Sequence, residues 1–285
     1  MSISKDQAAF TEIENEYDDI YVIISPPRCS STAFARVFWE QPTIRYYCHE
    51  PLGMYFTGQG LDDVIENVQN PLDVRDIKSF SRGEHGRSLV VKEMPYQVGE
   101  FFPSLISLSS NPVIFLTRDP RQNIASRMAK KMEVGDDPLF PQVETGWELI
   151  ANQIRYCKEE GIQYMIVDAK DFRNQPEMIF NQVFSRMGLP FHRRMLSWQS
   201  SPDVDIDNLD GDHHHLYQEV LSSTGMLPDT AAIPSLDSFP TEKGLRAHVA
   251  SCLQIYEQLQ RSSTRIRVPA DRPHRIYWEG IFPGD

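Results

Sequence analysis

The sequence has no long hydrophobic run, few cysteines and a shortage of basic residues. No apolar stretch approaches the ~18 residues that cross a bilayer, so we expect neither a membrane span nor a membrane partner. The four cysteines lack CxxC spacing, which indicates free thiols in a reducing compartment. A net charge of −12 leaves too few cations for a long nucleic-acid groove, although a compact anion site needs only a few.

Two sequence signals are also missing. The N-terminus has no basic start followed by an apolar stretch, so we expect no signal peptide and a cytoplasmic protein. The Walker A pattern G-x-x-x-x-G-K-[ST] does not occur, which weakens an ATPase or GTPase interpretation.

The chain has 285 residues and 40% hydrophobic residues, enough for one large α/β domain over 1–285. Apolar β-branched runs predict strands at 20–25, 88–92, 112–117 and 162–168. Helical patterns are at 32–40, 120–131, 145–159, 175–187 and 241–260. This alternation is typical of a parallel sheet built from βαβ units. Residues 199–240 lack apolar periodicity and are predicted to be loops that cap a site.

A loop rich in hydroxyl groups follows the first predicted strand. It reads SPPRCSST over residues 25–32 and leads into a predicted helix. A helix N-terminus there presents unpaired backbone N–H groups and the positive end of the helix dipole. Ser30, Ser31 and Thr32 add hydroxyl donors, and Arg28 adds a bidentate cation. The loop predicts a phosphate site; the alternative is that Ser and Thr are ordinary N-caps here.

A second anion signal, LTRDPRQNIAS, spans residues 116–126. Arg118 lies just past a predicted strand, and Ser126 lies on the following helix. The carboxyl ends of parallel strands line the ligand crevice, so both side chains could reach one anion. The alternatives are an ion pair of Arg118 with Asp119 or another carboxylate, and a solvated Ser126.

Together the two segments resemble the nucleotide-binding motifs of the sulfotransferase family. PRCSST at 27–32 is similar to the family's loop around the 5′-phosphosulfate of 3′-phosphoadenosine 5′-phosphosulfate (PAPS). RDPRQNIAS at 118–126 is similar to the segment that holds the 3′-phosphate. The further segments HEPL, KEMP and MGLPF…LSW resemble bacterial and fungal sulfotransferase-like proteins, over residues 20–225. The resemblance implies a P-loop NTPase-like, three-layer α/β/α fold with a central parallel sheet.

The resemblance also implies site residues. The 5′ end of the nucleotide would be held by Arg28, Cys29, Ser30, Ser31 and Thr32. The 3′-phosphate would be held by Arg118 and Ser126. The implied reaction moves a sulfuryl group from PAPS to a hydroxyl of a small-molecule acceptor, while Arg28 stabilises charge on the leaving phosphate. No metal is expected, because cations already hold that phosphate.

A third match, CHEPL at 48–52, resembles a segment whose glutamate acts as the base, which implies that role for Glu50. His49 is the competing base, because its ordinary pKa is nearer neutrality. If residues 48–50 are extended, the two side chains point to opposite sides. We also expect partial burial to raise the pKa of Glu50. Lys92, at the end of a predicted strand, is expected near the nucleotide or acceptor, the alternative being a surface lysine.

Several positions depart from the family pattern. Ser30 replaces the loop glycine, and Ala33 stands where many cytosolic members carry a tryptophan. The C-terminal R-K-G-x-x-G-D-W segment is missing. A substitute cation could come from Arg265, Arg267, Arg272 or Arg275. These departures keep open a non-catalytic nucleotide-binding protein of the same fold, and a nucleotide-dependent kinase is the other alternative.

The remaining polar and aromatic residues carry weaker signals. Three consecutive histidines at 213–215 cannot all face one metal ion on regular structure, so we expect a solvated loop or an acceptor contact. Trp147, Trp198 and Tyr217 are expected in the core rather than around an acceptor. Asp168 is expected to cap the end of its strand. The sequence does not decide whether the protein is a monomer or a homodimer.

Overall fold

The computed structural model describes residues 10, 13–80, 86–206 and 217–268. Its centre is a six-stranded sheet in the order β3-β2-β4-β1-β5-β6. The strands are β1 (Ile20–Ile24), β2 (Ile44–His49), β3 (Leu72–Asp73), β4 (Ser88–Glu93), β5 (Val113–Thr117) and β6 (Tyr164–Asp168). All neighbouring pairs are parallel except β2 and β3, which pair antiparallel at one edge.

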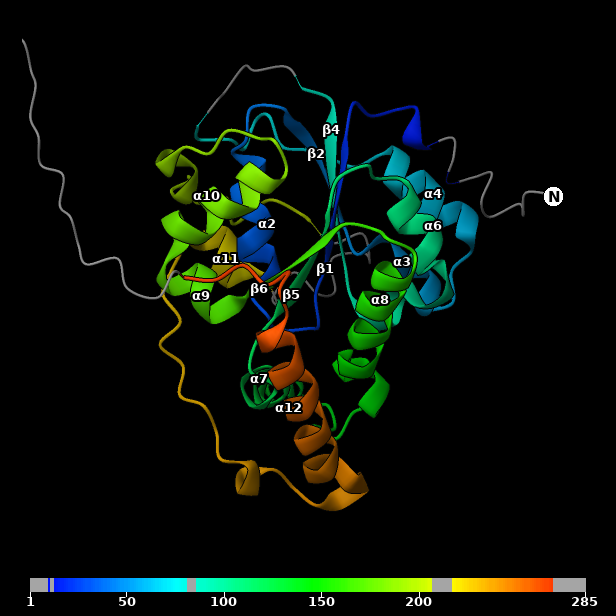
Figure 1. Ribbon diagram of the computed structural model, residues 1–285, viewed down its shortest axis with the longest axis vertical. Helices are drawn as coiled ribbons and strands as arrows, with labels where there is room; N and C mark the ends of the chain where they lie inside the picture. The colour runs from blue at the N-terminus through cyan, green and yellow to red at the C-terminus, as the bar shows by residue number, and fades with distance from the viewer. Residues whose placement is uncertain (1–9, 11–12, 81–85, 207–216, 269–285) are drawn as a thin grey trace, which may run out of the picture.

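Helices cover both faces of the sheet, as Figure 1 shows. On one side lie α2 (Ser31–Trp39), α9 (Ala169–Asn174), α10 (Pro176–Arg186) and α11 (Gln218–Ser222). On the other lie α3 (Pro51–Phe56), α4 (Leu61–Gln69), α6 (Phe102–Ser107) and α8 (Trp147–Glu159). The chain also forms α5 (Pro95–Val98), α7 (Pro120–Glu133) and α12 (Leu245–Arg261). The predicted three-layer α/β/α arrangement is therefore confirmed.

The two cores follow from the alternation of side chains along each strand. In β1, Tyr21 and Ile23 pack into the core with α2 and α10, whereas Val22 and Ile24 pack into the core with α6 and α8. Because β1 is buried on both faces, its sequence is a continuous apolar run. The same reasoning predicted the buried strands β4, β5 and β6, which the structure confirms.

Sequence patterning missed β2 and the short edge strand β3. The sequence of β2 is IRYYCH, and Arg45 and Tyr46 in it are only partly buried, so no continuous apolar run marks it. Asp73 in β3 instead bonds the Arg45 guanidinium (3.0 Å), a polar contact at the sheet edge. This omission matters because β2 leads directly into Glu50.

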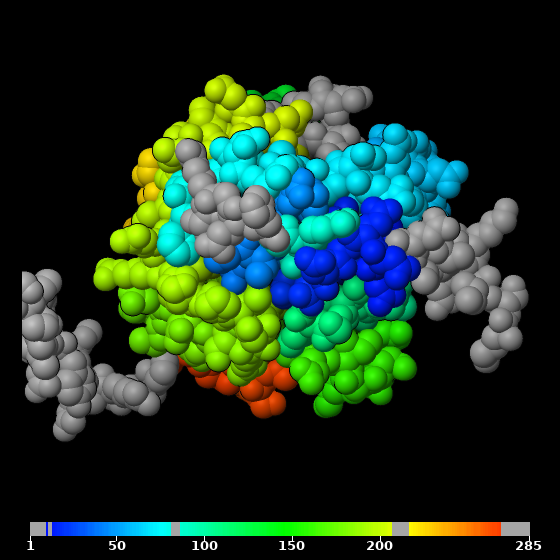
Figure 2. All heavy atoms as spheres, turned by 90° about the horizontal axis from the view of Figure 1, so that it is seen from above, coloured from blue at the N-terminus to red at the C-terminus, as the bar shows by residue number. Residues whose placement is uncertain are grey.

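Two chain segments lie side by side at the end of the sheet where β1 and β4 begin. Figure 2 views this end, where the blue segment before β1 lies beside the cyan chain that leads into β4. Arg87 joins them, because its backbone N–H donates to Asp18 (3.0 Å) and its guanidinium to the Glu16 carbonyl (2.7 Å). The carboxyl ends of the strands lie at the opposite end, where ligands of such sheets bind.

Candidate active site

The loop between β1 and α2 has an unusual backbone. Arg28 (φ 63°) and Ser30 (φ 59°) both adopt the left-handed conformation, which costs a non-glycine residue about 1–2 kcal/mol. Such residues gather at functional sites. The Ser30 hydroxyl does not cap α2; it accepts a hydrogen bond from Arg173 Nη1 (3.3 Å). The N-cap alternative therefore does not describe Ser30.

A cavity of about 1180 Å³ opens at this loop. Its wall includes Arg28, Ser30, Ser31 and Thr32, together with the start of α2. The first backbone N–H groups of a helix have no carbonyl partner within the helix, so they are available to an anion. Ordinary ligand pockets measure about 300–1,000 Å³. This cavity is therefore large enough for a nucleotide and a second small molecule.

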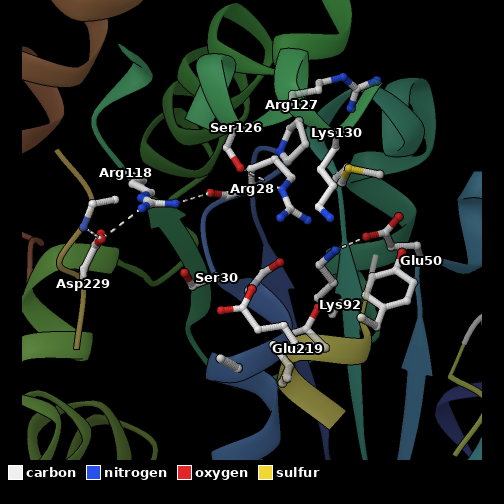
Figure 3. Close-up of a pocket in the computed structure, with 18 of the residues that line it drawn as sticks. Arg28, Ser30, Glu50, Lys92, Arg118, Ser126, Arg127, Lys130, Glu219 and Asp229 are labelled. Atoms are coloured by element: carbon white, nitrogen blue, oxygen red, sulfur yellow. Dashed lines mark hydrogen bonds and ion pairs between the residues drawn. The ribbon is translucent and has the colours of Figure 1, made fainter. Parts of the chain in front are cut away.

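The two predicted anion segments meet in this cavity, although 98 positions separate Arg28 from Ser126. Arg28 Nε donates to Ser126 Oγ (3.2 Å), and Arg118 Nη1 donates to the backbone oxygen of Arg28 (3.1 Å). Figure 3 shows the three side chains around one space. Ser126 is thus a cavity residue rather than a solvated surface residue.

Arg118 also has a carboxylate partner. Its Nη2 bonds Asp229 Oδ1 (3.0 Å), and Arg173 Nη1 lies 3.9 Å from the same oxygen. The alternative that Arg118 forms an ion pair is therefore confirmed. Its partner is Asp229 and not Asp119, because Asp119 pairs with Arg121. Three arginines and Asp229 therefore lie at the phosphate loop, and Glu219 on α11 lines the same cavity.

The other end of the cavity holds a buried ion pair. Glu50 and Lys92 are 8% and 3% exposed, and Lys92 Nζ bonds Glu50 Oε1. Gln97 Nε2 donates to the other carboxylate oxygen (3.3 Å). Both Glu50 and Lys92 line the cavity, and Figure 3 shows Lys92 between Arg28 and Glu50. The surface-lysine alternative for Lys92 is therefore excluded.

A family model described as a sulfotransferase domain matches residues 20–249. The chain belongs to the sulfotransferase family. No protein with a curated description matches the chain significantly. No candidate span for a membrane occurs among the helices of the described residues.

The structure is similar to solved sulfotransferases. The sulfotransferase domain of the Synechococcus PCC 7002 olefin synthase is 14% identical, with a TM-score of 0.51 over 85% of this chain and 96% of that one. A sulfotransferase domain from the curacin biosynthetic pathway (17%, TM-score 0.47) covers 85% and 97%. Mouse sulfotransferase SULT7A1, complexed with PAP (12%, TM-score 0.48), covers 92% and 91%. Membership of the sulfotransferase family, together with the mostly parallel six-stranded sheet, confirms the predicted P-loop NTPase-like fold.

The condition under which His49 and Glu50 would point to opposite sides is not met. Glu50 is not extended; it adopts a left-handed backbone (φ 51°, ψ 48°) where β2 turns into α3. Its Oε1 consequently lies 3.5 Å from His49 Nε2, so the two side chains share one side. His49 lies behind Glu50, its Nδ1 2.5 Å from the hydroxyl of Tyr47, and is not part of the cavity wall. Its role as a competing base in this sulfotransferase stays untested.

The expected direction of the Glu50 pKa was wrong. Burial raises it, but Lys92, His49 and the hydrogen bonds from Lys92 and Gln97 outweigh burial and lower the pKa below 4.5. Burial, opposed by Glu50 and aided by Lys92, lowers the pKa of His49 to about 3. Glu50 is therefore ionised, and His49 neutral, at working pH.

Glu93, the neighbour of Lys92, has a different environment. It points away from the cavity, as strand alternation predicts, and accepts from the backbone N–H of Leu52 (2.6 Å) and Met94 (3.1 Å). Burial raises its pKa to about 8, and the hydrogen bond from Leu52 and the charge of Lys92 offset burial only in part. Glu93 thus stabilises the start of α3, which carries Glu50.

The remaining predicted residues lie partly in the core and partly at the cavity. Cys29 is fully buried behind the loop, so only its backbone can face a nucleotide. Tyr217 packs against the core as expected but is only partly buried and also lines the cavity, whereas Trp147 and Trp198 are core residues as predicted. Asp168 caps α9 by accepting from the Lys170 N–H (3.0 Å), as expected.

Of the four C-terminal arginines proposed as a substitute cation, the structure describes Arg265 and Arg267, and neither lines the cavity. Arg265 pairs with Asp171 (2.5 Å), and Arg267 bonds backbone carbonyls. Arg272, Arg275 and the histidines at 213–215 lie outside the described residues. The cations that line the cavity beyond the two motifs are instead Arg173 on α9 and three residues of α7, Arg127, Lys130 and Lys131. Sequence reasoning missed them because the family motifs do not mark these residues as site residues.

Within the described residues, His, Cys, Asp and Glu form no group of three or more that could hold a metal ion. All four cysteines are buried and free. The prediction of scattered thiols is thereby confirmed.

Proposed function

We propose that this sulfotransferase moves the sulfuryl group of PAPS to a hydroxyl of a small-molecule acceptor in the cytoplasm. The observation that carries the proposal is the Arg28–Ser126 contact (3.2 Å), which joins the two anion segments in one cavity. A nucleotide with phosphates at both ends of its ribose needs two such anion contacts in one place. The Glu50–Lys92 pair lies in the same cavity and supplies the acceptor side.

The donor would bind with its 5′-phosphosulfate on the amides of α2 and the hydroxyls of Ser31 and Thr32. Arg28 would lie at the phosphate that leaves and stabilise its developing charge. Arg118 and Ser126 would hold the 3′-phosphate. These groups are fixed by the fold before the ligand arrives, which is how positioning and electrostatics accelerate group transfer.

Glu50 would take the proton of the acceptor hydroxyl as its oxygen attacks sulfur. The S–O bond to the phosphate breaks, the nucleotide leaves as adenosine 3′,5′-bisphosphate (PAP), and the proton remains on Glu50. An ionised carboxylate with a lowered pKa is a weak base. It suffices here because the hydroxyl becomes acidic only as the new O–S bond forms. Lys92 would donate its remaining N–H groups to the transferred sulfuryl oxygens.

The test is incubation of the purified protein with PAPS and a panel of hydroxyl compounds, followed by mass spectrometry for PAP and a sulfated product. We expect turnover to survive EDTA, because arginines and backbone amides take the place of a metal at the leaving phosphate. Activity that EDTA abolishes and magnesium restores, with ATP as donor, would contradict this proposal and favour the kinase alternative.

A further inference from the structure

A strap of residues 227–231 crosses the donor end of the cavity. Arg173 donates from Nε and Nη2 to two of its carbonyl oxygens (2.9 and 3.0 Å). Gln122 Nε2 donates to a third carbonyl (2.7 Å), and Asn174 Oδ1 accepts from a strap N–H (3.0 Å). These contacts tie the strap to α7 and α9, on both sides of the phosphate loop.

The strap carries Asp229 into the arginine cluster. The Asp229 side chain is 3% exposed, and its Oδ1 accepts from Arg118 Nη2 (3.0 Å). Its Oδ2 has no hydrogen-bond partner within the described residues, and neither has Arg118 Nε. Figure 3 shows the carboxylate facing the Arg118 guanidinium. The Ala231 N–H also donates to Oδ1 (3.2 Å), so Arg118 and the strap itself hold this oxygen, while the unpaired Oδ2 is costly to bury.

A carboxylate and a phosphate compete for the same edges of a guanidinium. Each Nη atom of Arg118 donates one hydrogen, Nη1 to the backbone oxygen of Arg28 and Nη2 to Asp229, while Nε has no partner within the described residues. A 3′-phosphate that binds the Nε–Nη2 edge of Arg118 through two hydrogen bonds meets the negative charge of Asp229 on Nη2 and therefore competes with it. Given the function proposed above, on which this inference rests, we propose that Asp229 competes with the 3′-phosphate for Arg118. Asp229 thereby determines whether the site prefers nucleotides with or without a 3′-phosphate.

The displaced carboxylate has a second partner close by. Arg173 Nη1 is 3.9 Å from Asp229 Oδ1, so a small movement of the strap lets Arg173 take over the charge. The phosphate then gains Arg118 without leaving a buried carboxylate unpaired. The net effect in the wild type is a lower affinity for the 3′-phosphorylated nucleotide, because part of its binding energy moves the strap.

The experiment is calorimetric titration of the wild type and Asp229→Asn with PAP and with AMP, which lacks the 3′-phosphate. We expect Asp229→Asn to bind PAP at least about tenfold more tightly, while AMP changes less than about threefold. Asp237→Asn is the control, because Asp237 lies farther along the same loop with a side chain 92% exposed. It should leave both affinities unchanged.

If Asp229→Asn does not fold, as judged by its melting curve, Gln122→Ala asks the same question. It removes one contact that holds the strap and should tighten PAP binding about two- to tenfold. Two results would overturn the competitor role and leave the proposed function standing. In the first, the wild type binds PAP and Asp229→Asn binds it no more tightly. In the second, Asp229→Asn tightens AMP binding as much as PAP binding. Failure of wild type and variants alike to bind either nucleotide would overturn both.

Discussion

The two ends of the cavity differ in how their charged side chains are paired. At the donor end Arg28, Arg118 and Arg173 gather around the phosphate loop, and Asp229 is shared by two of them. At the acceptor end Glu50 and Lys92 neutralise each other in a buried pair. The donor end therefore has positive charge available to bind an anion. At the acceptor end Glu50 can accept a proton, while the positive charge of Lys92 still balances the negative charge of the transferred sulfuryl group. This difference implies that donor-end variants change binding and acceptor-end variants change turnover.

The largest expected effect is at the acceptor end. Glu50→Gln should lower single-turnover rate about 10²–10⁴-fold, because the base is lost. PAP affinity should stay within a few-fold, because Glu50 lies away from the arginine cluster. His49→Asn should lower the rate less, since His49 does not line the cavity.

Glu50→Gln also leaves the Lys92 ammonium without its buried partner. The double variant Glu50→Gln, Lys92→Gln removes both charges and separates lost chemistry from charge imbalance. If Glu50→Gln is nearly normal and His49→Asn is inactive, histidine is the base and the assignment of Glu50 fails.

A smaller effect is expected at the donor end. Arg118→Ala should weaken PAP binding by about 1.5–3 kcal/mol, the range for a hydrogen bond to a charged group, and should change AMP binding little. Arg121→Ala is the matched control three residues later, in the first turn of α7, because Arg121 pairs with Asp119 (2.7 Å) outside the cavity wall. Equal weakening of PAP and AMP by Arg118→Ala, measured by calorimetry, would refute the 3′-phosphate assignment.

The smallest effect is the pH dependence of turnover. The pKa of Glu50 is lowered, so Glu50 remains a competent base until the pH falls below its ordinary value of 4.5. The acid limb of kcat that belongs to Glu50 should therefore lie below pH 4.5, and the donor-end variant Arg118→Ala should not move it. A pH–rate profile with an acid limb near neutrality would instead assign the base to another group.

The sequence predicted those features that depend on local pattern. Continuous apolar runs marked β1, β4, β5 and β6, because these strands are buried on both faces. The two anion segments were also predictable, since a loop between strand and helix places their side chains at the carboxyl edge of the sheet. The Arg28–Ser126 contact then follows from the topology.

The rest depends on contacts that no local pattern encodes. The left-handed backbone of Glu50 reverses the orientation that alternation predicts, and so changes both its neighbours and the direction of its pKa shift. Arg173 and Asp229 lie 145 and 201 positions after Arg28 in ordinary polar sequence, and only the fold brings them to the phosphate loop. Tyr217 reaches the cavity in the same way.

The central claim is that the cavity recognises a nucleotide with phosphates at the 3′ and 5′ positions. Calorimetric titration of the wild-type protein with PAP and, separately, with AMP tests this most directly. We expect PAP to bind in the micromolar range or tighter and to raise the melting temperature. AMP should bind at least about tenfold more weakly, because it cannot engage Arg118. Equal affinities for the two nucleotides would contradict the account.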